Sequence, residues 1–275
     1  MNLVEKIEAN FVNFSPKERL IATYLLQEQH QLKNISIHEL SHSIGTSAAT
    51  ITRFCRKIGC ESFVELKMEL QASATPVVDT KELDEFHTVL QYYNRVIERT
   101  AELLDEEQIS RVIDLLMNAN RIVIYGMGSS GLTAKEFAIR LSRMGLNAIG
   151  ESDSHMMIIG SAITQAGDVV IGFSNSGETK EVIHAIKNAK QNKATTISIT
   201  SIKGSTIAKL SDEVLFVHSS RFVNNEQFAN TQLPFFYLVD VITLKLLEDH
   251  NYATKMKTTV QEILQNTNFT EDLTS

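Results

Sequence analysis

A serine-rich loop between a strand and a helix holds the residues best suited to binding an anion. Residues 168–173, DVVIGF, are a short run of strand-forming types, and helical spacing begins after the loop. Backbone N–H groups and the positive end of the helix dipole converge at such a junction, as a phosphate requires. The alternative is that the hydroxyls only cap the helix. One cap needs one hydroxyl, so the sequence favours a phosphate site at Ser174, Asn175, Ser176, Gly177 and Thr179.

A second loop, YGMGSSG, follows the strand predicted at residues 121–125. Its glycines satisfy the G-x-G-x-x-G pattern of dinucleotide-binding proteins, and Glu151 lies about 20 residues further on, where an acid would hold a ribose. Two observations favour a compact anion instead. Ser129 and Ser130 add hydroxyls to this loop, and an NAD site would leave the loop that begins at Ser174 without a role. The dinucleotide site stays as an alternative.

The amino-terminal quarter of the chain contains helical patterns with clear start signals. Capping boxes of the form Ser-x-x-Glu occur at residues 15–18, 36–39 and 62–65. Gly45 ends one short helix, and Thr46 or Ser47 can cap the next. Two short helices joined by a glycine-containing turn are typical of a helix-turn-helix.

The second of these helices has small residues at its start and basic residues further along. Residues 46–60 hold three basic residues and no acidic one, which is the charge expected of a helix that enters a major groove. The alternative is a solvated face of a plain helical bundle. That alternative explains the charges but not the small residues, so we expect DNA contacts from Ser47, Ala48, Ala49, Thr50, Thr52, Arg53, Arg56 and Lys57.

Charge and composition limit the other possibilities. The chain has 275 residues, 43% of them hydrophobic, and a net charge of −7, all of which lies after residue 75. An acidic protein repels nucleic acid in bulk, so DNA binding must come from a local patch. No apolar run approaches the roughly 18 to 20 residues of a membrane span, and the amino terminus has no signal-peptide pattern, so a cytoplasmic location is expected. Cys55 and Cys60 lack zinc-site spacing, so we expect buried thiols, no metal and no cofactor.

The predicted order of elements divides the chain. We expect an all-α domain at residues 1–75, a linker and connecting helix at 76–105, and an α/β domain at 106–275. Five strands alternate with helices and predict a mainly parallel sheet, with ligands at the carboxyl ends of its strands. The connecting helix has apolar residues at helical steps, and a final apolar helix is predicted from Gln227 to Asp249. The expected apolar face of the connecting helix consists of Leu83, Phe86, Leu90, Tyr93, Ile97 and Leu104.

These motifs resemble two known protein domains. The Ser-x-Ser-Gly-x-Thr loop after a buried strand resembles the sugar-isomerase (SIS) fold, and residues 36–59, with TSAATITRFCRKIG at their centre, resemble the helix-turn-helix domain of the RpiR family of bacterial transcriptional regulators. The resemblance implies a regulator of sugar or amino-sugar metabolism that binds a double-stranded DNA operator as a homodimer or homotetramer. It also implies that Ser129, Ser130 and the loop at Ser174 bind a phosphosugar effector.

Phosphosugar isomerases share the SIS fold, so an isomerase is the alternative to a regulator. Isomerisation needs a general base close to the sugar carbons. The available residues are Glu178, Glu226, His155 and His184. Glu226 has two interpretations: it contacts the effector, or it is a carboxylate in the first turn of a helix. We expect no catalytic residues.

Overall fold

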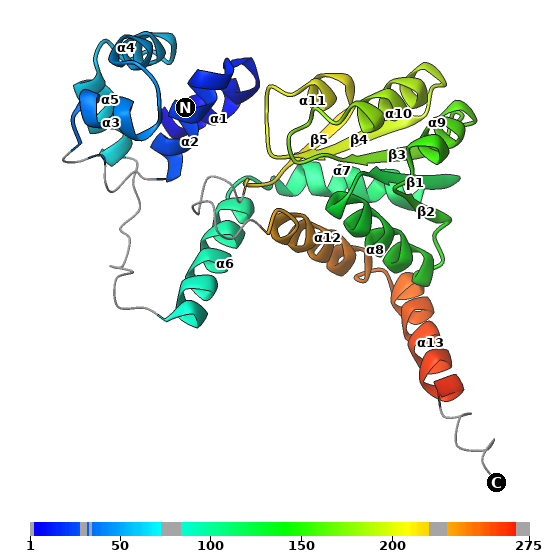
Figure 1. Ribbon diagram of the computed structural model, residues 1–275. Coiled ribbons are helices and arrows are strands. Elements are labelled where there is room, and N and C mark those ends of the chain that lie inside the picture. The colour runs from blue at the N-terminus through cyan, green and yellow to red at the C-terminus, as the bar shows by residue number, and fades with distance from the viewer. Residues whose placement is uncertain (1–2, 28–31, 33–34, 73–83, 220–229, 268–275) are drawn as a thin grey trace.

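The computed structural model describes residues 3–27, 32, 35–72, 84–219 and 230–267 (Figure 1). A group of helices at the amino terminus is followed by an α/β domain. The predicted five-stranded sheet is present, and every strand is parallel to its neighbours. Among the described helices, none combines the length and the apolar character needed to cross a membrane.

The amino-terminal helices begin largely where the capping signals predict. Ser36 and Glu39 form both bonds of a capping box, and Ser15 pairs with Glu18 in the same way. The third predicted box is only half formed, because the Glu65 carboxylate accepts from the backbone of Glu61 instead. The elements are α1 (Leu3–Asn10), η1 (Phe11–Asn13), α2 (Pro16–Gln27), α3 (Ile37–Ser43), α4 (Ala48–Lys57) and α5 (Phe63–Ala72).

These helices share one apolar core. Ile21 and Leu25 of α2, Leu40 of α3, and Ile51 and Phe54 of α4 are fully buried in it. Burying such a side chain contributes about 1.5–3 kcal/mol, so the core determines which face of α4 points outward.

Both cysteines lie in this core as free thiols, as the sequence predicts. Burial raises the pKa of Cys55 to about 12 and the pKa of Cys60 to about 11, so both thiols stay protonated near neutral pH. Within the described ranges, no group of three or more His, Cys, Asp or Glu side chains could hold a metal ion.

The α/β domain is built on a sheet with the strand order β2-β1-β3-β4-β5. β3 is buried along its whole length, which explains its unbroken apolar sequence. Because the strands are parallel, all five carboxyl ends lie at one edge of the sheet. The strands are β1 (Arg121–Gly126), β2 (Ala148–Glu151), β3 (Asp168–Phe173), β4 (Thr195–Thr200) and β5 (Glu213–Phe216).

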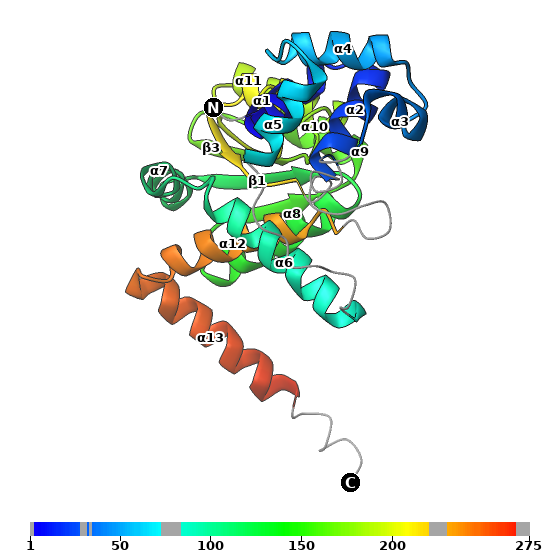
Figure 2. The ribbon, with the colours of Figure 1, turned by 90° about the vertical axis from the view of Figure 1, so that its left-hand side faces the viewer.

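Helices cover both faces of this sheet (Figures 1 and 2). One face packs against α7, α8 and α12 around Ile122 and Ile124, and the other packs against α9, α10 and α11 around Val123 and Tyr125. The covering helices are α7 (Glu106–Met117), α8 (Ser129–Arg143), α9 (Ser154–Ala162), α10 (Lys180–Gln191), α11 (Thr206–Leu210) and α12 (Leu233–Leu246).

Two further helices extend from the body of the domain, and they differ from the prediction. In α6 (Glu85–Ala101), Phe86 is 84% exposed and Leu90 is 56% exposed, so the predicted apolar face is wrong there. The buried residues are Tyr92, Val96 and Thr100, because α12 packs only against the later turns. The other extended helix, α13 (His250–Thr267), has no counterpart in the prediction.

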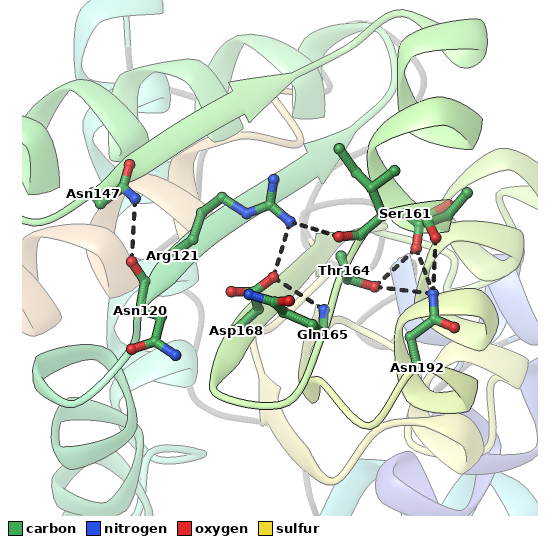
Figure 3. A network of polar contacts seen from close by, with 10 residues as sticks. Asn120, Arg121, Asn147, Ser161, Thr164, Gln165, Asp168 and Asn192 are labelled. Atoms are coloured by element: carbon green, nitrogen blue, oxygen red, sulfur yellow. Dashed lines mark hydrogen bonds and ion pairs between the residues drawn. The ribbon is translucent and has the colours of Figure 1, made fainter.

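A buried ion pair connects the starts of β1 and β3 (Figure 3). The Asp168 carboxylate has 2% of its side-chain surface exposed, and it accepts from Arg121 Nη2 at 2.9 Å and from the Gln165 backbone at 3.1 Å. Arg121 and Asp168 are also register partners in the sheet. The pair therefore ties the two strands together at the edge opposite their loops.

Replacing Arg121 by Met leaves the Asp168 carboxylate buried without its cation. We expect the free energy of unfolding to fall by about 3 kcal/mol, as measured by urea denaturation. The control is Arg111→Met, because the Arg111–Glu213 pair is more exposed, and it should cost less than about 1 kcal/mol. Equal losses in the two variants would contradict a structural role for the buried pair.

Candidate functional site

The two serine-containing loops start side by side at the carboxyl edge of the sheet. Gly126 ends β1 and Phe173 ends β3, and these two residues are register partners. The first loop leads directly into α8 at Ser129, and the second leads into α10 at Lys180. Parallel pairing thus brings to one edge two loops that lie almost 50 residues apart in the sequence.

The second loop is held in shape by its own hydroxyls. Ser174 is buried, and its Oγ lies 2.9 Å from Thr179 Oγ1. Ser176 is exposed, and its Oγ accepts from the Glu178 backbone N–H at 3.2 Å. Thr179 is the N-cap residue of α10, yet its side chain makes no capping hydrogen bond. The capping alternative therefore does not account for these hydroxyls.

Glycine is required at position 177 for two reasons. The residue has φ = +67°, and a Cβ there would lie 2.2 Å from Ser205 Oγ. Ser205 is fully buried, so it cannot swing out into solvent to make room. The tight contact presses the loop against the segment that follows β4 and fixes its path.

The glycines of the first loop have local packing roles. A Cβ on Gly126 would lie 2.5 Å from the Ser130 carbonyl oxygen, and one on Gly131 would lie 2.5 Å from Ser152 Cβ. Gly128 has φ = +56° and is the N-cap residue of α8, where it offers no side chain to cap the helix. The three glycines of the G-x-G-x-x-G pattern thus let β1 turn sharply into α8, and Ser129 is exposed at the start of the helix.

The acid expected of a dinucleotide site is used differently. Glu151 Oε1 accepts from the backbone N–H groups of Ser152 at 2.7 Å and Asp153 at 2.9 Å. This carboxylate oxygen therefore shapes the turn between β2 and α9. The observation counts against the dinucleotide alternative.

A third loop, after β4, belongs to the same region but was not predicted from the sequence. Ser201 Oγ donates to Asn175 Oδ1, and the Ser201 backbone N–H donates to the Asn175 carbonyl at 3.1 Å. Thr200 Oγ1 donates to the same carbonyl at 3.3 Å. The hydroxyl-rich sequence TSIKGST after a strand was the signal that could have identified this loop.

Three of the four residues considered as general bases lie in the described part of the chain, where Glu178 is engaged by a neighbouring segment and both histidines are exposed. The Glu178 carboxylate accepts from the Thr206 backbone at 2.7 Å and from Thr206 Oγ1 at 2.8 Å, so it holds α11 in place. His155 is exposed on α9 and His184 is exposed on α10. Glu226 lies outside the described residues.

The start of α12 reaches the first turns of α8. Thr133 Oγ1 donates to Gln232 Oε1 at 2.8 Å, and Gln232 is the N-cap residue of α12. Gln232 therefore lies one turn of α8 away from the exposed Ser129.

Two cavities in the described part of the chain lie away from these loops. One, of about 420 Å³, contacts Asn118, Gly167 and Thr195, and the other is lined by α8, β2 and α13.

The helix-turn-helix is formed by α3, Gly45 and α4. Ser47 caps α4, because its Oγ accepts from the Thr50 backbone N–H at 3.2 Å. Thr50 Oγ1 in turn accepts from Arg53 at 3.2 Å. The helix buries Ile51, Phe54 and Cys55, and its exposed residues are Ser47, Ala49, Arg53, Arg56 and Lys57. Ala48, Thr50 and Thr52 are half-buried.

The basic residues of α4 differ in how firmly they are held. The Lys57 ammonium lies 2.9 Å from Glu18 of α2, donates to the Asn13 carbonyl at 3.3 Å and stands over the Phe14 ring. Burial acts to raise the pKa of Glu18, but the hydrogen bonds from Lys57 and Ser15 and the Lys57 charge outweigh it, so the pKa lies below its ordinary value. Lys57 thus anchors α4 to α2. Arg56 is exposed on the outer face.

Comparisons with known proteins identify the family. The model of the rpiR-family helix-turn-helix domain matches residues 1–76, and the model of the SIS domain matches residues 115–241. An uncharacterised HTH-type transcriptional regulator of Caldanaerobacter subterraneus is 35% identical, over 75% of this chain and 77% of its own. Another from Haemophilus influenzae is 31% identical, over 94% and 95% of the two chains. The chain belongs to the RpiR family of HTH-type transcriptional regulators.

Solved structures agree with this RpiR-family assignment. The NanR protein of Vibrio vulnificus, complexed with ManNAc-6P, has 28% identity and a TM-score of 0.61, covering 96% of this chain and 98% of its own. The sugar isomerase domain of an RpiR transcription factor from Sphaerobacter thermophilus has a TM-score of 0.58 over 66% of this chain and 99% of its own. At 17% identity, it supports the fold alone. In this RpiR-family chain, α6 and α13 lie outside both matched domain ranges.

Proposed function

We propose that this RpiR-family protein regulates sugar or amino-sugar metabolism by binding operator DNA in a manner controlled by a phosphosugar. The observation that carries the proposal is the pair of hydroxyl-bearing loops at one sheet edge, in a chain that also has a helix-turn-helix. In this proposal, residues 1–75 bind DNA and residues 106–275 bind the effector. Residues 76–105 form the linker and helix that connect these two domains. The protein works in the cytoplasm as a homodimer or homotetramer.

The effector phosphate binds between the starts of α8 and α10. Both helices begin at this edge, so the positive ends of their dipoles point toward it, which stabilises a dianion. Similarity to NanR, whose structure holds ManNAc-6P, supports an amino-sugar phosphate as the ligand class. The proposed contacts are Ser129, Ser130, Ser174, Asn175, Ser176, Gly177, Thr179 and, from outside the described residues, Glu226.

Operator DNA is contacted by the exposed face of α4. Small residues at the helix start allow a close approach to base edges, and the basic residues further along meet phosphates. Arg53 and Arg56 are both exposed, so both side chains can reach the DNA backbone. Arg53 is also oriented by its hydrogen bond to Thr50. The proposed contacts are Ser47, Ala48, Ala49, Thr50, Thr52, Arg53, Arg56 and Lys57.

The loop after β4 links the two sites. Ser201 is hydrogen-bonded to Asn175 of the phosphate loop, and the next residue, Ile202, is only 5% exposed because it packs in the amino-terminal helical core. A ligand that moves Asn175 therefore moves a side chain embedded in the DNA-binding domain. We infer that effector binding changes DNA affinity through this contact.

Regulation rather than catalysis is supported by the side chains around the loops. Glu178 is engaged by Thr206, and His155 and His184 are exposed on separate helices. Both relatives described above are named as transcriptional regulators. We therefore propose that the bound phosphosugar is released unchanged, with no cofactor involved.

The test of the function is a DNA-binding titration with a panel of sugar phosphates. DNA from upstream of the protein's own gene is labelled and titrated, and we expect one phosphosugar to change the affinity several-fold. Gly177→Ala should abolish that response, because the new Cβ displaces the phosphate loop. In calorimetry, Gly177→Ala should weaken effector binding roughly tenfold or more, because the loss of even one charge-assisted hydrogen bond has about that effect.

The control for Gly177→Ala is Gly145→Ala. Gly145 also has a positive φ, +84°, but its neighbour is the flexible Lys255 side chain, and it lies just past the end of α8 that is opposite to the loops. Both variants carry about 1–2 kcal/mol of backbone strain, and only Gly177→Ala should lose effector binding. Turnover of the phosphosugar, together with no sequence-preferring DNA binding, would favour the isomerase alternative instead.

The affinity of the protein for DNA should depend on the salt concentration in a way that reports the phosphate contacts. If Arg56 contacts a phosphate, Arg56→Ala should flatten the slope of log affinity against log salt by about 0.9 per subunit. The control is Lys67→Ala, which removes the same charge from the same domain where it is bonded to the Ile35 carbonyl. Anisotropy titrations at several salt concentrations measure both slopes. An unchanged slope for Arg56→Ala would remove Arg56 from the interface.

The link between the sites is tested by Ile202→Ala. This variant should keep its affinity for the effector, because Ile202 is outside the phosphate loop, while the change in DNA affinity caused by the effector shrinks. Lys203→Ala, one residue along the same loop, removes an exposed side chain and should respond like the original protein. A full response in Ile202→Ala would show that coupling takes another route.

A further inference from the structure

The serine at the start of α11 does not cap its own helix. Ser205 is the N-cap residue of α11, a position where a serine side chain normally accepts from a backbone N–H of the first turn. Its hydroxyl makes no such bond. Instead, the Thr206 N–H donates to the Glu178 carboxylate at 2.7 Å, and the Ile207 N–H donates to the Gly177 carbonyl at 3.1 Å. The loop between β3 and α10 thus takes over part of the capping, and the Ser205 hydroxyl is left for another role.

This hydroxyl is buried beneath the same loop. Within the part of the chain that the structure describes, Ser205 Oγ is inaccessible to solvent and has no hydrogen-bond partner. It lies against Gly177, where a Cβ would be only 2.2 Å from it. The neighbouring Ser176 is exposed, so the loop has an exposed side and a buried side. A buried hydroxyl without a partner destabilises a protein, so one that lies against a candidate binding loop requires an explanation.

The planarity of the peptide group links the two sides of the loop. In a trans peptide, the N–H and the C=O point in opposite directions. The Gly177 N–H donates to the Ser174 carbonyl at 3.0 Å, and among the described residues the Ser176 carbonyl accepts no hydrogen bond. If an anion at the exposed side attracts the Gly177 N–H, the Ser176 carbonyl of the same peptide group must turn toward the buried side. Glycine at position 177 permits this rotation, because it adopts either sign of φ at little cost.

We propose that Ser205 is a positioning residue of the effector site. When a phosphate binds, the Ser176–Gly177 peptide group turns its N–H toward the anion, and its carbonyl accepts a hydrogen bond from the Ser205 hydroxyl. The bond forms only in the bound state, so it favours that state over the free one. This inference rests on the proposed function, because it requires a phosphate at the loop.

The position of Ser205 also gives the new bond a route to the DNA-binding helices. The Ser205 N–H donates to the Ile202 carbonyl at 3.1 Å, and the Ile202 side chain packs in the amino-terminal helical core. A hydrogen bond formed at Ser205 therefore acts on the turn that carries Ile202. Ser205 and Ser201 thus join the two loops at both ends of this turn, but only the bond from Ser205 depends on the phosphate.

The test is Ser205→Ala in the full-length protein, with two measurements. In urea denaturation without phosphate, the midpoint should stay the same or rise, because the substitution removes a buried hydroxyl that has no partner. In a titration with inorganic phosphate, followed by phosphorus NMR, binding should weaken about two- to tenfold, because one hydrogen bond of the bound state is lost. A residue with a purely structural role would not combine an unchanged stability with a weaker affinity.

The matched control is Ser198→Ala. Ser198 Oγ on β4 is also fully buried without a partner among the described residues, but its register partner is Gly172 in the interior of β3. This variant should bind phosphate as tightly as the original protein. A lower urea midpoint for Ser205→Ala would show that its hydroxyl already has a structural role, and an unchanged phosphate affinity would show that no bond forms on binding. Either result overturns the proposal.

Failure of this inference can be told apart from failure of the proposed function. Inorganic phosphate involves neither the sugar nor DNA, so phosphate binding that depends on Ser205 supports the inference even where no phosphosugar alters DNA affinity. Phosphate binding that Ser205→Ala leaves unchanged overturns the inference, while the regulatory function stands. The titration is repeated with the panel of sugar phosphates, and an original protein that binds none of these anions overturns both.

Discussion

The parallel pairing of β1 with β3 is the constraint on which both loops of the candidate effector site depend. At one end of the pair, the buried Asp168 carboxylate requires Arg121, which is its register partner. At the other end, Gly126 and Phe173 are partners, so the two loops start at the same level. A slip of one residue would turn the side chains of a strand to the other face and separate the buried charges. The ion pair therefore supports a site that lies at the far edge of the sheet.

Tight contacts of glycine shape the loops of the site. Gly177 lies against Ser205, and Gly126 and Gly131 let the start of α8 approach β1. These close approaches leave Ser129 and Ser176 exposed at the edge while Ser174 is buried. A rigid backbone with a few exposed hydroxyls costs little reorganisation when an anion binds.

Interactions between the loops connect the α/β domain with the DNA-binding helices. The loop between β3 and α10 is hydrogen-bonded through Asn175 to the loop after β4, and Ile202 of the loop after β4 is part of the helical core. Within the helix-turn-helix, Lys57 bonds Glu18 and so holds α4 on α2. The charge patch of α4 therefore has two parts, an anchor at its end and exposed arginines along its outer face.

Much of the fold was readable from local patterns. The capping boxes at Ser15 and Ser36, the two short helices around Gly45 and all five strands depend on residues near one another in sequence, and the structure confirms them. The extra helix α13 was missed because its apolar residues are sparse and mixed with polar ones. The buried face of α6 was wrong because apolar residues at helical steps were available on more than one side, and packing against α12 chose Tyr92 and Val96.

The sequence by itself determined which loops carry hydroxyls and glycines, and which helix carries basic residues, because these are properties of composition and spacing. Only the tertiary structure decided how those groups are used. Glu178 is bound by Thr206, Asn175 by Ser201, and Lys57 by Glu18, each across 26 or more residues of sequence. Such pairings depend on the order of strands and the packing of helices. No local pattern encodes that order, since it results from burying all the apolar faces together.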